Sequence, residues 1–399
     1  MGPGWWDNWS RPIREGLTSD RARDRRSESQ RGEAVTVKRM GRRGLFLSVA
    51  VVAVALPLSA PATRATAAHA DDDHGGARNV LITDQYNNRV IQVDQVTKSI
   101  VWSFGSGNPR LCNPGPGSII GSNDAERLSG GLTLLSGTGT PLGGSPAAPN
   151  FSCADNRVIV VNHSGTIVWQ YGQAGVTGAG PNQLNVPVFA IPLPNRNILI
   201  TDQGNARVIE VDRFSKKVVW SYGPTSGPGA LNNPNSAELL PNGHVLIADE
   251  NNNRVIEITH SGHIVWQYGS GNPSLTHPLE FAAFASRLPN GDTLITDSGH
   301  SRIVEVNAEK EVVSEYFTNK SPNSAASPLP TNAVRLENGN TSIADQFNHR
   351  AIIVNGDGQL VEQIGETNVF GRGFDHLDGP YTAFVIGDYT GQTPPPANF

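Results

Sequence analysis

One sequence pattern recurs along the chain, and its spacing constrains the fold more than any other feature. Each copy has an apolar run ending in Asp, a short turn containing Asn, an Arg, and a second apolar run, as in "HVLIADENNNRVIEIT" from His244. The acids Asp202, Asp249, Asp297 and Asp345 lie 47, 48 and 48 residues apart. This period is typical of the blades of a β-propeller rather than of helical solenoids.

Two further strands complete each repeat. After the hairpin comes an apolar strand such as "TIVWQYG" or "KVVWSYG", rich in Val, Ile, Trp and Tyr and bounded by Gly, Asn or Pro. Before the hairpin comes a strand marked by one alanine, found at Ala125, Ala190, Ala237, Ala285, Ala333 and Ala383. A small residue at this point suits the innermost strand, where neighbouring blades crowd around the axis.

The number of blades follows from how the repeats begin and end. Hairpins begin near residues 79, 131, 197, 244, 292 and 340, and the last alanine strand, at 381–386, has no hairpin after it. The first hairpin lacks an alanine strand before it, so both ends of the propeller complete one blade. We therefore predict an all-β, six-bladed β-propeller with four-stranded blades, closed by the C-terminal strand joining the first blade.

The hairpin resembles the NHL repeat, which has a glycine, an apolar strand ending in Asp, an Asn-containing turn, and an Arg opening a second strand. Five good copies and one poor one cover most of residues 78–390. The Trp-bearing strands are similar, more distantly, to arylsulfotransferase-like and quinoprotein-type propellers. Such a resemblance implies the architecture and says little about the activity.

The N-terminal region has the composition of a targeting segment. Residues 1–39 are charged and Arg-rich, and are either a non-native extension or a disordered tail. Residues 40–70 have the layout of a signal peptide, with paired arginines, an apolar run, and Ala68-His69-Ala70 as cleavage site. We expect a mature chain of residues 71–399, secreted or in the cell envelope, with Sec and twin-arginine export both open. The apolar run is shorter than the roughly 20 residues of a membrane span.

The charge balance argues against one class of partner. Residues 1–70 hold 12 of the 31 Lys and Arg and 6 of the 36 Asp and Glu. The rest of the chain therefore has 19 basic and 30 acidic residues, a net charge of −11. A chain this acidic is not expected to bind nucleic acid.

The second repeat departs from the others. Gly137 stands where the acid is expected, and a long Gly/Pro/Ser-rich insertion with Cys153 separates the two strands of the hairpin. Cys112 lies in the enlarged loop before this repeat, on the same rim of a propeller. A Cys112–Cys153 disulfide is expected in an exported chain, with free thiols as the alternative. It would remove loop entropy worth about 3–4 kcal/mol.

The most regular polar residues are Asp and Arg pairs five positions apart. They are Asp84 and Arg89, Asp202 and Arg207, Asp249 and Arg254, Asp297 and Arg302, and Asp345 and Arg350. Catalysis normally needs an asymmetric convergence at one place, whereas each blade positions its own pair. We interpret the pairs as structural turn devices, with catalysis or metal binding as the alternative.

The histidines are not periodic and are candidates for chemistry. His277 and His376 lie in connections entering inner strands, and His300 and His349 lie in hairpin turns, all on one face. Four clustered histidines could form a metal site or a general base with its partner. The alternative is four unrelated loop histidines.

Polar residues of the inner strands are candidates for ligand binding. Asp124, Glu126, Asn235, Glu238 and Asn332 are expected near the central channel. Oxygen ligands converging on the axis could hold Ca²⁺, unless strand alternation sends these side chains between blades. Arg287 and Arg335 occupy equal positions two residues past the alanine, where they could meet an anionic ligand or pair with acids.

Two functions remain open. The first is a binding module that recognises a protein, a glycan or a small molecule through its loop-rich face or channel mouth. The second is a propeller enzyme, either an arylsulfotransferase-like transferase with a histidine nucleophile or a metal-assisted hydrolase or lyase at the axis. No hydrolase, metalloprotease, phosphate-binding or dinucleotide motif is present.

Overall fold

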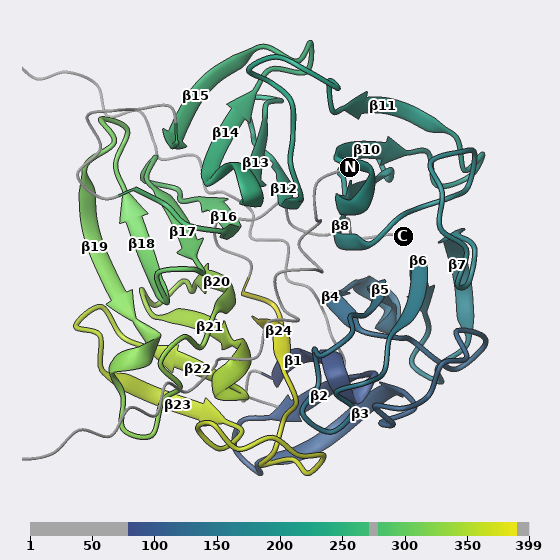
Figure 1. Ribbon diagram of the computed structural model, residues 1–399, viewed down its shortest axis with the longest axis vertical. Helices are drawn as coiled ribbons and strands as arrows, with labels where there is room; N and C mark the ends of the chain where they lie inside the picture. Colours follow the sequence, from purple (N-terminus) through teal and green to yellow (C-terminus); the bar gives the residue numbers. More distant parts are fainter. Residues whose placement is uncertain (1–78, 271–277, 389–398) are drawn as a thin grey trace, which may run out of the picture. The chain divides into compact units, whose positions relative to one another are not determined.

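A computed structural model of the protein describes residues 79–270, 278–388 and 399. These residues form six four-stranded antiparallel sheets arranged around a central axis (Figure 1), which confirms the six-bladed propeller. The predicted N-terminal extension (1–39) and signal peptide (40–70) lie outside the described residues, as does His277. Within the described residues, no helix is long and apolar enough to cross a membrane.

Each blade runs from an innermost strand to an outermost one. The first blade contains β24 (Pro380–Val385), β1 (Asn79–Asp84), β2 (Arg89–Asp94) and β3 (Ser99–Gly105). The second contains β4 (Ser122–Arg127), β5 (Thr133–Thr140), β6 (Cys153–Val161) and β7 (Ile167–Gly172), and the third β8 (Pro187–Pro192), β9 (Ile198–Asp202), β10 (Arg207–Val211) and β11 (Val218–Tyr222).

The other three blades follow the same order. The fourth contains β12 (Pro234–Leu239), β13 (Val245–Asp249), β14 (Arg254–Ile258) and β15 (Ile264–Gly269). The fifth contains β16 (Ala282–Arg287), β17 (Thr293–Asp297), β18 (Arg302–Val306) and β19 (Val312–Phe317). The sixth contains β20 (Pro330–Arg335), β21 (Thr341–Asp345), β22 (Arg350–Val354) and β23 (Leu360–Ile364).

The C-terminal strand closes the ring. β24 pairs antiparallel with β1, with Ala383 opposite Ile82 and Val385 opposite Val80. This strand begins and ends one residue before the predicted range of 381–386. Because it covers the inner edge of β1, the first blade has the same four strands as the others and exposes no extra edge at the axis.

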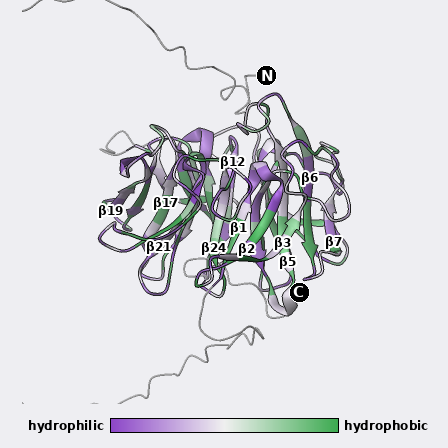
Figure 2. Ribbon diagram, turned by 90° about the horizontal axis from the view of Figure 1, so that it is seen from below, coloured by the Kyte–Doolittle hydropathy of each residue, from purple (hydrophilic) through white to green (hydrophobic). Residues whose placement is uncertain are grey.

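The hydrophobic core lies between neighbouring blades. One cluster, for example, joins Val80 and Ile82 of the first blade to Ala344 and Ile353 of the sixth. Hydrophobic stretches follow the strands and hydrophilic stretches follow the connecting loops (Figure 2). The outermost strands alternate: Val265 is 51% exposed, whereas Tyr268 is buried. This alternation is expected of a strand with one face on the core and one in water.

The repeated Asp joins the hairpin turn to the loop that enters the inner strand of its own blade. Asp249 accepts hydrogen bonds from Arg254 Nε at 2.7 Å, from Asn252 at 2.8 Å, and from the backbone N–H of Asn232 at 2.8 Å. The same Arg-to-Asp pair forms at 2.7–2.8 Å in the first, third, fifth and sixth blades. In four of these blades the turn between the two residues is a short 3-10 helix: η1 (Gln85–Asn87), η3 (Gln203–Asn205), η4 (Glu250–Asn252) and η6 (Gln346–Asn348).

The second blade obtains its acid from the opposite strand. Asp155 in β6 accepts the N–H of Ile120 at 2.7 Å and pairs with Arg157 Nε at 2.5 Å. A Cβ atom at Gly137 would lie 2.7 Å from Asp155 Cγ, so the glycine leaves the space that Asp155 fills. The sequence pattern missed Asp155 because the acid had moved across the hairpin.

Candidate functional site

The insertion of the second blade is held at two points. Cys112, in the loop between β3 and β4, and Cys153, at the start of β6, form the predicted disulfide, with Cα atoms 5.5 Å apart. Further along the insertion, Ser145 Oγ donates a hydrogen bond to Asp378 Oδ2 of the first blade at 2.7 Å. Burial raises the pKa of Asp378 to about 7. The insertion is therefore anchored at two points, near its middle and at its end, to loops adjoining the first blade.

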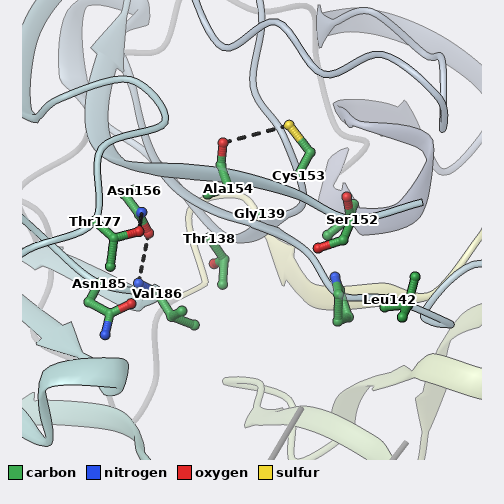
Figure 3. A pocket seen from close by; sticks show the side chains of 12 residues that line it. Thr138, Gly139, Leu142, Ser152, Cys153, Ala154, Asn156, Thr177, Asn185 and Val186 are labelled. Atoms are coloured by element: carbon green, nitrogen blue, oxygen red, sulfur yellow. Dashed lines mark hydrogen bonds between the residues drawn. The ribbon is translucent and has the colours of Figure 1, made fainter. Parts of the chain in front are cut away.

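A pocket of about 320 Å³ lies where this insertion meets the third blade (Figure 3). Its wall is formed by the end of β5, the start of β6, both ends of the insertion between them, and the loop leading into β8. The lining residues are Thr138, Gly139, Thr140, Pro141, Leu142, Ser152, Cys153, Ala154, Asn156, Thr177, Asn185 and Val186.

The pocket wall is held rigid by hydrogen bonds among its own residues. Asn156 donates to Thr177 Oγ1 at 2.9 Å and accepts the N–H of Val186 at 2.8 Å (Figure 3). Thr138 Oγ1 donates to the carbonyl of Pro187 at 2.6 Å. The hydroxyl of Thr140 is buried without a hydrogen-bond partner.

The chemistry of this pocket is neutral. None of its lining residues carries a group that ionises, because Cys153 is in the disulfide. The wall offers hydroxyls, amides and backbone groups next to apolar surface, which suits ligand binding. Its lining contains no carboxylate, imidazole or free thiol, so any polar contact with a ligand would be made by hydroxyl, amide or backbone groups.

A cluster of buried polar side chains lies near the axis, on the same face as the insertion. The residue directly after each repeated Asp is buried and polar: Gln85, Gln203, Glu250, Ser298 and Gln346. Three of these side chains donate hydrogen bonds into neighbouring blades: Gln85 to Asn123 at 2.6 Å, Gln346 to Gln85 at 2.8 Å, and Gln203 to Glu250 at 3.3 Å. The sequence signal for this cluster is the Gln, Glu or Ser that directly follows each repeated Asp, and the hairpin pattern alone does not predict its contacts.

Tyr381 carries this network across the axis. It lies on β24 in the first blade, yet its hydroxyl accepts a hydrogen bond from Asn235 Nδ2 on β12 at 2.8 Å. The first and fourth blades face each other across the ring (Figure 1). Asn235 also donates to Glu250 at 3.0 Å, and burial raises the pKa of Glu250 to about 8.

The acids of the inner strands face the next blade. Asp124 Oδ2 accepts the N–H of Ala190 at 3.0 Å, and Glu238 Oε2 accepts the N–H of Arg287 at 2.9 Å. Burial raises the pKa of Asp124 to about 8 and the pKa of Glu238 well above its ordinary value. These two carboxyl groups therefore contribute to contacts between blades. Asn332 is fully buried, and neither atom of its amide has a partner.

Glu126 occupies the position of Glu238 but lacks its partner. Where the fifth blade presents the N–H of Arg287 to Glu238, the third blade presents Pro192 to Glu126, and proline has no N–H. Oε1 of Glu126 is buried without a hydrogen bond. Burial, followed by the neighbouring Asp124, raises the pKa of Glu126 well above its ordinary value.

The two candidate arginines pair with the preceding blade. Arg287 Nη2 lies 2.9 Å from Glu257 Oε2, and its guanidinium lies 5.0 Å from the centroid of the Trp266 ring. Arg335 Nη2 lies 2.7 Å from Glu305 Oε2. Both guanidinium groups thus have carboxylate partners within the protein.

The described candidate histidines each have their own partners. His300 Nδ1 lies 2.9 Å from Asp297, where other blades have an Asn–Asp hydrogen bond. His376 lies 3.0 Å from Asp375 and 3.4 Å from Glu366.

His349 is buried and serves as an acceptor. Its Nδ1 accepts the N–H of Gly379 at 3.2 Å, and burial lowers its pKa to about 4. In the ranges that the structure covers, no group of three or more His, Cys, Asp or Glu could hold a metal ion.

Comparisons with known proteins agree on the fold. The family model described as outer membrane protein assembly factor BamB matches residues 154–368. A solved protein of unknown function from Bacteroides caccae is similar, with a TM-score of 0.51 and 16% identity, covering 72% of this chain and 93% of that one. At this identity the likeness concerns the fold.

Two weaker structural similarities were also found. Virginiamycin B lyase from Staphylococcus aureus has a TM-score of 0.44 and 14% identity, covering 72% of this chain and 83% of its own. A chain of a nidogen/laminin complex has a TM-score of 0.48 and 11% identity, covering 77% of this chain and 97% of its own. No curated protein sequence matches the chain.

Proposed function

The chain belongs to the PQQ_2 family, described as outer membrane protein assembly factor BamB, and from this premise we propose that it is a binding module. The observation that carries the proposal is the neutral pocket of about 320 Å³ beside the insertion of the second blade. A preformed hollow with fixed amides, an unpaired hydroxyl and an apolar rim can hold a ligand, and its lining includes no acid or base side chain.

A protein segment is the ligand that we propose for this pocket. The family is named for a protein assembly factor, and propellers commonly serve as scaffolds for protein partners. Leu142, 52% exposed at the pocket, provides an apolar contact at its edge. Fixed amide and backbone groups beside it suit the alternating polar and apolar character of an extended peptide.

The NHL-like repeat and the signal peptide remain part of this proposal. An exported chain with its insertion closed by a disulfide would work outside the cytoplasm, either secreted or in the cell envelope. The pairing of Cys112 with Cys153 supports such a location, because disulfides persist in oxidising compartments.

The enzyme hypothesis has less support. A transferase with a histidine nucleophile, or a metal-assisted hydrolase or lyase, requires side chains that converge on one reacting position. His300, His349 and His376 instead contact separate sets of partners.

A pocket-filling variant tests the proposal. Ala154→Trp would place an indole in the pocket, and Val219→Trp is the matched control, because Val219 is exposed on the outer strand of the third blade. Both variants and the mature chain would be tested against arrays of peptides and of glycans, with Kd measured for each hit. We expect peptide binding that Ala154→Trp weakens at least tenfold and Val219→Trp leaves within twofold. Peptide binding that survives Ala154→Trp would contradict the proposal, as would glycan binding alone.

A further inference from the structure

In three of the spaces between neighbouring blades, called trenches below, the same contact recurs on the face opposite the insertion. A Trp in the outer strand of one blade donates its indole N–H to a backbone carbonyl in the next blade. Trp102 donates to His163 at 2.9 Å, Trp169 to Arg213 at 2.7 Å, and Trp220 to His260 at 2.8 Å. Each of these indoles therefore lies in the trench between two blades with one edge fixed.

The side chain that covers the indole differs from trench to trench. The guanidinium of Arg127 lies 4.5 Å from the centroid of Trp102, and Arg287 lies 5.0 Å from that of Trp266. Both arginines are the last residue of the inner strand in the following blade. The corresponding residue facing Trp169 is Pro192, so this inner strand supplies no cation to the ring.

Phe399, the last residue of the sequence, contacts Trp169 instead. The two rings meet edge to face, with centroids 6.3 Å apart and planes at 87°. Phe399 also packs against the hydrophobic cluster that contains Leu128 and Tyr171, alongside Leu132. The edge-to-face arrangement of Phe399 and Trp169 is one that aromatic pairs prefer.

Arg213 of the third blade also contacts Phe399. Its guanidinium lies 4.5 Å from the centroid of Phe399 and 4.6 Å from that of Phe214. Arg213 thus contacts two aromatic rings while its carbonyl accepts the indole N–H of Trp169. Within the described residues, its Nη1 is buried without a hydrogen-bond partner, and the guanidinium group lies over both rings at cation–π distance.

We infer that Trp169, Arg213 and Leu132 form a binding site for an aromatic side chain, and that Phe399 of the same chain is its ligand. This aromatic site is separate from the pocket proposed above, because it lies on the opposite face. When Phe399 occupies this site, the chain that follows β24 of the first blade ends in the trench between the second and third blades.

A peptide added in trans tests the inference on the full-length chain. Phe399→Ala empties the aromatic site, and the probe is the peptide PPPANF, which has the sequence of residues 394–399. We expect this variant to bind the peptide saturably, with a change in tryptophan fluorescence, and the unchanged chain to bind it at least tenfold more weakly. The peptide PPPANA is the control for the ring and should not bind.

A second variant identifies the place of binding. Arg213 lies on a surface turn, so Arg213→Ala combined with Phe399→Ala should fold and should lose peptide binding at least tenfold. Val219→Ala combined with Phe399→Ala is the matched control and should bind as Phe399→Ala does. Equal binding by the unchanged chain, binding of PPPANA, or binding that survives Arg213→Ala would each overturn the inference, as would a complete lack of binding.

Discussion

At the scale of single residues, the two turn histidines act as substitutes for asparagine. In three blades an Asn directly before the Arg of the hairpin accepts the N–H of the residue before the next inner strand: Asn88 from Gly121, Asn156 from Val186, and Asn253 from Phe281. His349 does the same for Gly379. These hydrogen bonds join each blade to the next, so a change at such a position should act on stability.

The first prediction concerns His349. His349→Asn should keep the free energy of unfolding within about 1 kcal/mol, because an amide oxygen can accept the N–H of Gly379. His349→Ala should lower it by about 1–3 kcal/mol, since that buried N–H would lose its acceptor. Urea unfolding at neutral pH checks both variants. Equal losses in the two variants would show that the ring itself, rather than its acceptor, stabilises the blade.

The second prediction concerns Glu126 and Pro192. The raised pKa of Glu126 means that its contribution to stability is fully present below the ordinary pKa of glutamate, near 4.5, and is lost as pH rises towards its folded value. Pro192→Ala should supply an N–H to this carboxylate, as Arg287 does for Glu238. The variant should therefore lose less stability between pH 5 and pH 8.5 than the unchanged chain.

Removal of a proline also lowers the free energy of unfolding, which opposes the gain from the new hydrogen bond to Glu126. A more flexible unfolded chain should cost about 0.4–1 kcal/mol at every pH, so only the slope against pH reports on Glu126. Urea unfolding at both pH values measures that slope. In a Glu126→Gln background, Pro192→Ala should leave the slope unchanged. A slope altered equally in both backgrounds would rule out this explanation.

At the scale of elements, the repeat predicts strands well and predicts side-chain contacts only where every blade is alike. The Asp and Arg pairs were predicted as turn devices, and each forms within its own hairpin. Asp155 was not predicted, because its carboxylate reaches the same N–H position from the opposite strand, a geometry that no spacing reveals. The pocket was not predicted for a related reason: its wall depends on how the insertion folds back on the rim.

The third prediction concerns the disulfide of this insertion. Cys112→Ser with Cys153→Ser should lower the free energy of unfolding by up to about 3–4 kcal/mol in the chain-entropy account. The loss should be smaller if Ser145 and Asp378 hold the insertion in place, so Ser145→Ala in the double variant should lower stability further. Denaturant unfolding measures both steps. Hydrogen exchange confined to residues 138–156 would locate the loosening, whereas no change in exchange there would contradict it.

At the scale of the whole molecule, closure of the ring depends on contacts that no single blade contains. β24 pairs with β1 across the ends of the propeller, and the repeat predicted this from the unpaired first hairpin and last strand. The hydrogen bonds near the axis were not predicted, because residues 146 positions apart meet there only once all six blades are in place. Tyr381 and Asn235 thus join opposite sides of the finished ring.

The fourth prediction concerns this connection across the axis. Tyr381→Phe removes one hydroxyl, leaving the buried amide of Asn235 with one partner fewer, and should lower the free energy of unfolding by about 1–3 kcal/mol. Asn235→Ala also removes the hydrogen bond to Glu250 and should cost more than Tyr381→Phe. The double variant should still lose less than the sum of the two single variants, because both changes break the Tyr381–Asn235 contact, and a double-mutant cycle measures that coupling. Tyr316→Phe, on the outer strand β19, is the control and should change stability by less than about 0.5 kcal/mol. Fully additive losses from Tyr381 and Asn235 would mean that the two sides of the ring are stabilised independently.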